Sequence, residues 1–271
     1  MSKHLPDSFV SAEHKNYLRQ QKVYRLKILS AQVLLLVGFI ALWELAANLR
    51  WIDPFITSQP SRVMRTLLSL HNEGNLYMHT GVTVFETVVG FTLGTMIGTV
   101  IAVLLWWSEF LSEVLDPYLV VLNRLPKIAL GPIIIVWAGQ GMTAIIAMAL
   151  LISVVVTILV VYSGFTQVDT NKIKLLQSFG ATLWQILKKV FLPASVPTII
   201  AALKINVGLS WVGVIVGEFL VARAGLGYLI VYGGQGFRLD LVMTGVIILS
   251  LAAALMYQGV VLLEKVAMKW R

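Results

Sequence analysis

Residues 142–165 read MTAIIAMALLISVVVTILVVYSGF, a run of 24 residues without one charged side chain. About 20 apolar residues in a helix are needed to cross the hydrocarbon core of a bilayer. Of the 271 residues in the chain, 58% are hydrophobic and 13% are charged. A soluble domain carries roughly a quarter of its residues as charged side chains. Lipid must therefore form part of the solvent of this chain, and the run is expected to span a membrane.

Five other apolar runs resemble this one in length, so the sequence predicts an all-α integral membrane protein with about six transmembrane helices. The expected spans are 26–49, 81–107, 115–138, 142–165, 196–221 and 241–261. Residues 1–25 are expected to form an N-terminal tail, and residues 26–271 a single transmembrane domain. The first span begins too far from the N-terminus, and is too long, to be a cleaved signal peptide.

The basic residues are distributed unevenly between the loops. Lys and Arg gather before the first span, between the fourth and fifth spans, and after the sixth. Because cytoplasmic loops carry such an excess, both termini are expected in the cytoplasm, with the chain crossing a bacterial cytoplasmic membrane several times. The formal net charge of +8 is thus an orientation signal, and no nucleic-acid partner is expected. The absence of cysteine excludes disulfides and thiolate metal sites.

Residues 166–193, between the fourth and fifth spans, form the most specific local pattern. A short helix over 171–179 should end at Gly180, because glycine tolerates the left-handed conformation that ends helices. A second helix should begin at Thr182, with Gln185 three positions later in the capping-box arrangement. Pro193 should end it. We call these two helices, joined at Gly180, the elbow.

The first arm of the elbow carries apolar residues on a segment outside the expected spans. They are Ile173, Leu175, Leu176 and Phe179. Such residues mark either a protein interface or a helix that lies on lipid headgroups. The residue pattern alone leaves both interpretations open.

The elbow resembles the loop with which permeases of binding-protein-dependent ABC importers grip their ATPases. The family pattern is Glu-Ala-Ala, three residues, Gly, and a Leu-Pro about a dozen positions later. The matching residues here are Gly180, Ala181, Trp184 and Leu192-Pro193. Lys174, Leu175 and Leu176 stand in place of Glu-Ala-Ala, so the acidic residue of the family pattern is missing.

The resemblance covers about residues 58–256 and is to the nitrate, taurine and sulfonate branch of that family. Four further groups carry it: Pro60-Ser61; Asn123-Arg124-Leu125-Pro126 with Ala129–Pro132 and Trp137–Gly139; Trp211-Val212-Gly213 through Glu218; and Gly225 through Ile230. Their order and spacing match the family.

The resemblance implies a dimer of permeases, with cytoplasmic ABC ATPase subunits and an extracytoplasmic solute-binding protein as partners. The implied ATPase-docking residues are Lys174, Leu175, Leu176, Gln177, Ser178, Phe179, Gly180, Ala181 and Thr182. No Gly-x-x-x-x-Gly-Lys-Ser/Thr loop occurs, so ATP and Mg²⁺ are expected to bind to the partner ATPase. We expect no enzyme activity, cofactor or metal site in this chain itself. The implied solute is a sulfonate, taurine, nitrate or a related anion; a vitamin precursor is the alternative.

Polar residues near or inside the spans are candidates for the translocation path, because an unpaired charge in lipid is costly. The candidate set is Asn123, Arg124, Asn206, Ser210, Trp211, Glu218 and Glu86. Structural roles stay open for several of them: interhelical hydrogen bonds for Asn206 and Ser210, pairing with Arg223 for Glu218, and pairing with His79 or a neighbouring helix for Glu86. Lys204 is expected to snorkel towards water. Glu44 is expected at an interface or a helix contact.

Glycines recur at four-residue intervals in the second span, at Gly90, Gly94 and Gly98, and in the fifth, at Gly213 and Gly217. This spacing places them on one helix face and predicts close helix packing. The apolar, glycine-rich segment 225–236 is too short for a span, and we expect a re-entrant or surface segment that is either part of an outer gate or a connector. A secondary transporter is the competing class, but the inverted repeats typical of that class are not evident.

Overall fold

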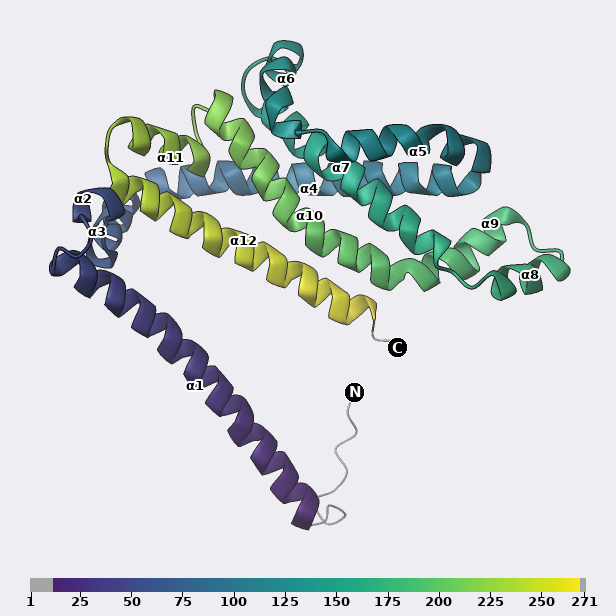
Figure 1. The fold of residues 1–271 in the computed structure, drawn as a ribbon, viewed down its shortest axis with the longest axis horizontal. Helices are drawn as coiled ribbons and strands as arrows, with labels where there is room; N and C mark the ends of the chain where they lie inside the picture. The colour runs from purple at the N-terminus through teal and green to yellow at the C-terminus, as the bar shows by residue number, and fades with distance from the viewer. Residues whose placement is uncertain (1–11, 269–271) are drawn as a thin grey trace. The chain divides into compact units, whose positions relative to one another are not determined.

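The computed structural model describes residues 12–268, and within this range every regular element is a helix (Figure 1). The elements are α1 (Ala12–Asn48), α2 (Pro54–Thr57), α3 (Pro60–Asn72), α4 (Asn75–Trp107), α5 (Glu109–Arg124), η2 (Lys127–Leu130), α6 (Gly131–Ala138), α7 (Met142–Thr166), α8 (Thr170–Ser178), α9 (Leu183–Ile186), η3 (Leu187–Phe191), α10 (Leu192–Val221), α11 (Leu226–Gln235) and α12 (Leu239–Ala267). The chain divides into two compact units, residues 1–64 and 65–271.

The first unit consists of α1, α2 and the start of α3. The most apolar stretch of α1 has no buried residue, as expected of a helix whose solvent is lipid. Glu44 Oε2 accepts a hydrogen bond from the backbone N–H of Ser61 at 3.0 Å, so the expectation of a helix contact for Glu44 is confirmed. Helical structure begins at Ala12, within the expected tail 1–25, and residues 1–11 lie outside the described residues.

The core of the second unit is built on α7, which packs most extensively against α10 and α4 (Figure 1). A Cβ atom placed on Gly90 of α4 would lie 2.8 Å from the Ala149 side chain, and one placed on Gly213 of α10 would lie 2.5 Å from the Ala149 Cα. Ala149 thus lies between two glycines on different helices. The predicted close packing of both glycine-bearing helices is confirmed, and its physical basis is the absence of side chains at the contacts.

Five helical segments are long and apolar enough to span a bilayer: α1, α4, α7, the continuous helix 183–221, and α12. A sixth span exists only if α5 and the segment 127–138 count together, and these meet at 90°. The span expected over 115–138 is therefore present only as a broken one, with the bend between α5 and the segment 127–138. Leu125, with φ −61° and ψ 135°, is extended because it precedes Pro126 and is disfavoured in the α region.

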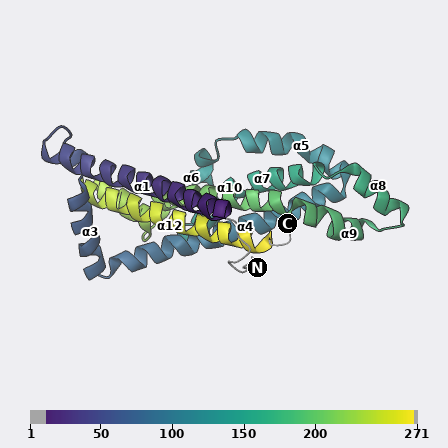
Figure 2. The same ribbon diagram turned by 90° about the horizontal axis from the view of Figure 1, so that it is seen from below.

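The elbow forms as predicted in its first arm and at its corner. Gly180 has a φ of +74°. Thr182 and Gln185 form a complete capping box. The expected end at Pro193 is wrong, because η3, a five-residue π-helix, leads directly into α10 with Pro193 as its second residue. The wider turn of a π-helix accommodates the ring, which would clash with the carbonyl four residues earlier in a regular α-helix. Figure 2 shows α8 and α9 at one end of the second unit, beyond α5 and α7.

An ion pair joins α10 to α12. Lys204 Nζ lies 2.6 Å from Glu264 Oε2, and the two side chains are 27% and 23% exposed. The expectation that Lys204 only snorkels is thus corrected. The C-terminal half of α12 supplies a carboxylate beside it, which a local sequence pattern does not reveal.

Candidate functional site

We name the two ends of the second unit by their elements. At the α11 end, α10 ends and α4 and α12 begin; at the elbow end, α7 ends and α10 begins. A buried polar group at the α11 end, which we call the carboxyl cluster, consists of His79, Thr83, Glu86 and Glu218. The exposed fraction of both glutamate side chains is 2%.

Glu218 joins α10 to α4 and to α11. Thr83 Oγ1 lies 2.6 Å from Glu218 Oε1. The backbone N–H groups of Gly227 and Tyr228 donate to the Glu218 carboxylate. The first N–H groups of a helix have no partner within it, and its N-terminus attracts negative charge. The Glu218 carboxylate therefore accepts hydrogen bonds from the start of α11 and stabilises this helix end.

The two preceding backbone N–H groups are satisfied from α4. Gly225 N donates to His79 Nδ1 at 3.0 Å, and Leu226 N donates to Thr83 Oγ1 at 2.7 Å. Gly225 has a φ of +118°, and a Cβ there would lie 2.3 Å from Glu218 Oε1. Four consecutive N–H groups at the start of α11 are thus held by side chains of two other helices.

Glu218 does not pair with Arg223, contrary to one of the sequence-based expectations. Arg223 is exposed, whereas Glu218 is buried against Thr83 and α11. The side chain of Glu86 on α4 instead lies within hydrogen-bonding reach of Glu218, where one proton shared by the two carboxyl groups would join them. The expectation that Glu86 pairs with a neighbouring helix is therefore confirmed.

Further polar residues lie buried along α10. Asn206 Nδ2 donates to Thr157 Oγ1 of α7 and, at 3.2 Å, to Thr95 Oγ1 of α4. The expected interhelical hydrogen bonding is confirmed for Asn206. Within the described part of the chain, several buried polar atoms nevertheless have no hydrogen-bond partner: Thr80 Oγ1, Glu86 Oε2, Asn206 Oδ1, Ser210 Oγ and Trp211 Nε1.

The structure brings together only part of the candidate path set. Glu86, Asn206, Ser210, Trp211 and Glu218 are all buried on α4 and α10, and Trp211 packs against residues of α4 and α12. Asn123 and Arg124 instead end α5 with exposed side chains, and Lys127 Nζ donates to the Asn123 carbonyl at 3.1 Å. That these residues line a path stays a prediction.

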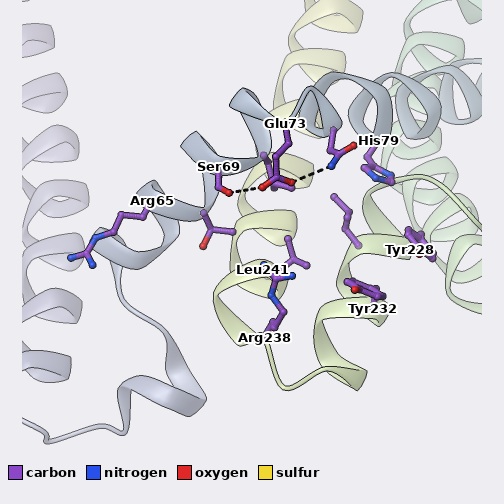
Figure 3. A pocket seen from close by; sticks show the side chains of 12 residues that line it. Arg65, Ser69, Glu73, His79, Tyr228, Tyr232, Arg238 and Leu241 are labelled. Atoms are coloured by element: carbon purple, nitrogen blue, oxygen red, sulfur yellow. Dashed lines mark hydrogen bonds between the residues drawn. The ribbon is translucent and has the colours of Figure 1, made fainter.

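A cavity of about 500 Å³ lies at the α11 end (Figure 3). Its walls come from α3, the α3–α4 turn, the start of α4, α11 and the start of α12. The residues that line it are Arg65, Thr66, Ser69, Leu70, Glu73, Asn75, His79, Tyr228, Leu229, Tyr232, Arg238 and Leu241. His79 belongs both to this cavity and to the carboxyl cluster.

The elbow has an inner and an outer face. Ile186, Leu187 and Phe191 are buried in a cluster with Phe165 of α7 and Ala102 of α4, and Ile173, Leu176 and Ala181 pack against this cluster. The Trp106 and Phe191 rings lie 4.4 Å apart between centroids. The outer face exposes Leu175, Phe179, Leu183 and Trp184, with Phe179 78% exposed. The elbow is thus an anchored base that presents an apolar outer surface.

Several residues of these sites are not among the sequence-predicted candidates. Thr83 lies three residues before Glu86 and seven before Gly90, so its place on the packed face of α4 could have been found from helical spacing. No local sequence pattern indicated that Glu73 and Arg238 line a common cavity, because the cavity forms only where α3, α11 and α12 meet.

Apolar helices packed through glycines, with buried polar residues between them, are typical of a multi-span membrane protein. The chain belongs to the family described as binding-protein-dependent transport system inner membrane component, whose model matches residues 92–267. It is accordingly a permease subunit of ABC importers. The expected family is thereby confirmed.

Several relatives are named as permeases of the same kind. The chain is 32% identical to a probable ABC transporter permease protein of Haemophilus influenzae, covering 86% of this chain and 94% of the relative. It is 28% identical to the putative aliphatic sulfonates transport permease protein SsuC of Bacillus subtilis, covering 88% and 87%. It is 27% identical to the formylaminopyrimidine transport permease protein ThiX of Halalkalibacterium halodurans, covering 86% and 92%.

The fold matches solved transporters as well. A chain of a bacterial ABC transporter involved in the import of the acidic polysaccharide alginate superposes with a TM-score of 0.66, covering 96% of this chain and all of that one. The sequence identity is 14%, so this likeness concerns the fold alone. The expected all-α membrane architecture is confirmed.

Proposed function

We propose that this importer permease is driven by a separate cytoplasmic ABC ATPase that docks on the elbow, and that it carries a small organic solute. The observation that carries the proposal is the elbow's outer face. Leu175, Phe179 and Trp184 are 58%, 78% and 60% exposed on a base packed against α4 and α7. Each such side chain contributes roughly 1.5–3 kcal/mol when a partner buries it fully.

The continuous helix 183–221 supports a mechanism for coupling. It begins in the elbow, and its far end carries Glu218, which holds α11. With 1.5 Å of rise per residue, a continuous helix of this length connects the elbow end directly with the α11 end. Closure of the ATPases on bound ATP and Mg²⁺ would move the elbow, and α10 would carry this movement to the α11 end. The permease is then a two-state element that partners bias from both sides.

The proposed orientation places the elbow end and both termini in the cytoplasm. The basic residues of the elbow, including Lys174, Lys188 and Lys189, are exposed and support this orientation. The α11 end then faces an extracytoplasmic solute-binding protein. A second copy of the permease completes the path, as the family resemblance implies.

The candidate path residues support a path that opens when helices separate. Glu86, Asn206, Ser210 and Trp211 each keep one buried polar atom without a partner in this state. An unsatisfied buried group costs about 1–3 kcal/mol, so contact with water or solute in another state would recover this free energy. Asn123 and Arg124, exposed at the end of α5, would contribute from the broken span.

The proposed solute is a small sulfonate such as taurine, which carries an amine as well as a sulfonate group, or a related anion, because the relative SsuC is named for aliphatic sulfonates. A vitamin precursor is the second candidate, because the similarly covered relative ThiX is named for formylaminopyrimidine. ATP and Mg²⁺ would be held by the partner.

Co-purification with the ATPase tests the proposal. Phe179→Asp places a charge on the outer face, and Gly180→Pro forces φ to about −65° where the elbow needs +74°. Both variants should lose the ATPase. Phe237→Asp, at a residue 72% exposed at the α11 end, is the matched control and should retain it. A correctly inserted wild-type permease that never captures the ATPase would overturn the proposal in favour of a secondary transporter.

A further inference from the structure

We infer that the cavity at the α11 end binds a small organic zwitterion, a molecule with both an amine and an acid group. The inference rests on the proposed function in one respect: it takes this molecule to be the transported solute. Binding itself can be measured on this chain alone. The cavity volume of about 500 Å³ falls within the roughly 300–1,000 Å³ of small-molecule sites. All the residues that line it belong to the second unit.

Glu73 supplies an oriented carboxylate to this cavity. Ser69 Oγ donates to Glu73 Oε1 at 2.8 Å, and Asn75 Nδ2 donates to Glu73 Oε2 at 3.2 Å (Figure 3). Gly74, with a φ of +75°, allows the tight turn between α3 and α4 that lets the three side chains meet. Each carboxylate oxygen can accept a further hydrogen bond, so an ammonium group is the complementary ligand group.

Arg238 supplies a guanidinium from the start of α12. Within residues 12–268, no ion pair or hydrogen bond joins its side chain to Glu73. Arg65 also lines the cavity, but Figure 3 shows its guanidinium directed away from the other labelled side chains. A carboxylate or sulfonate is the group that a guanidinium binds in two parallel hydrogen bonds.

The third wall is a row of stacked rings. The ring centroids of His79 and Tyr228 lie 5.8 Å apart with an interplanar angle of 20°, and those of Tyr228 and Tyr232 lie 6.0 Å apart at 21°. These rings offer an apolar surface for the ligand body. A ligand here contacts α11 directly, and the carboxyl cluster holds α11 to α4 and α10.

The two opposite charges select between ligand classes. A simple anion satisfies Arg238 but is repelled by Glu73, and a simple cation satisfies Glu73 but is repelled by Arg238. A zwitterion satisfies both, and its two groups must be spaced to reach both walls. The geometry therefore favours amino acids and aminosulfonates over singly charged molecules of the same size.

Isothermal titration calorimetry on the full chain in lipid nanodiscs tests the inference with two matched ligand sets. One set is phenylalanine, 3-phenylpropanoate and 2-phenylethylamine; the other is 2-aminoethanesulfonate and ethanesulfonate. At least one zwitterion should bind, and its singly charged analogues should bind about tenfold more weakly, as expected from the loss of one charge-assisted hydrogen bond.

Variants assign the binding to this cavity. Glu73→Gln and Arg238→Gln should each weaken zwitterion binding about tenfold. Glu113→Gln and Arg223→Gln, at exposed residues that do not line the cavity, should leave it unchanged. Equal binding of an amine-free acid, or equal binding by all four variants, would overturn the inference. A permease that captures its ATPase but binds neither zwitterion would overturn it too, while leaving the proposed function intact.

Discussion

The side chains of Thr83 and Glu218 meet across 135 positions of sequence, with Thr83 Oγ1 2.6 Å from Glu218 Oε1. The same threonine oxygen accepts the backbone N–H of Leu226. One hydroxyl group on α4 thus contacts both α10 and the start of α11. If α11 moves during transport, this contact is one of those that must break.

Thr83→Val should loosen α11, because valine has nearly the shape of threonine but neither donates to Glu218 nor accepts from Leu226. The loss should be about 1–3 kcal/mol of unfolding free energy. Hydrogen exchange of the amides 225–228 should accelerate, as measured by mass spectrometry in nanodiscs. Thr92→Val is the control, because the exposed Thr92 hydroxyl bonds only to the Val88 carbonyl of its own helix. Equal exchange in both variants would contradict the role of Thr83.

Gly227→Ala should displace the Glu218 carboxylate, since the added Cβ would lie 2.7 Å from Glu218 Oε2 and 2.8 Å from Glu218 Cβ. Overpacking of this kind costs about 1–3 kcal/mol. Gly234→Ala, in the same helix but with no atom within 4 Å of the new Cβ, should be neutral or stabilising by up to about 1 kcal/mol. Thermal unfolding in detergent measures the midpoint temperatures of the two variants. Similar midpoints for Gly227→Ala and Gly234→Ala would count against a tight fit at Gly227.

Gly213→Ala should separate α10 from α7. The new Cβ would lie 2.5 Å from the Ala149 Cα, a backbone atom that cannot rotate away. We expect a loss of about 1–3 kcal/mol, or more if both helices must shift. Gly208→Ala, also in α10, meets no atom within 4 Å and serves as the control. The same unfolding measurement applies, and a Gly213→Ala variant as stable as Gly208→Ala would show that the helices adjust freely.

Reversal of the ion pair between α10 and α12 should be tolerated only when both residues change. Lys204→Glu and Glu264→Lys should each destabilise the chain, and the double variant should recover part of the loss. Because both side chains are partly exposed, the coupling free energy should be small, about 0.5–1 kcal/mol. A double-mutant cycle of unfolding free energies measures it, and a coupling of zero would mean that the contact does not stabilise the fold.

Local patterns in the sequence determined the membrane-spanning character, the close-packing faces of α4 and α10, and the corner of the elbow. These features depend on residues within a few positions of one another: apolar runs, glycines at intervals of four, and the pair Thr182 and Gln185. The order of the family motifs also identified the permease. The residues that produce each of these features physically are the same neighbouring residues that reveal it in the sequence.

Tertiary structure alone decided the partners of the buried polar groups. Glu218 contacts Thr83 and Gly227 and not the nearby Arg223, and Lys204 pairs with Glu264, because helices distant in sequence pack beside them. The cavity between Glu73 and Arg238 exists only where α3, α11 and α12 meet. Local periodicity states which face of a helix is buried, but the partner on the other side is set by how the helices pack.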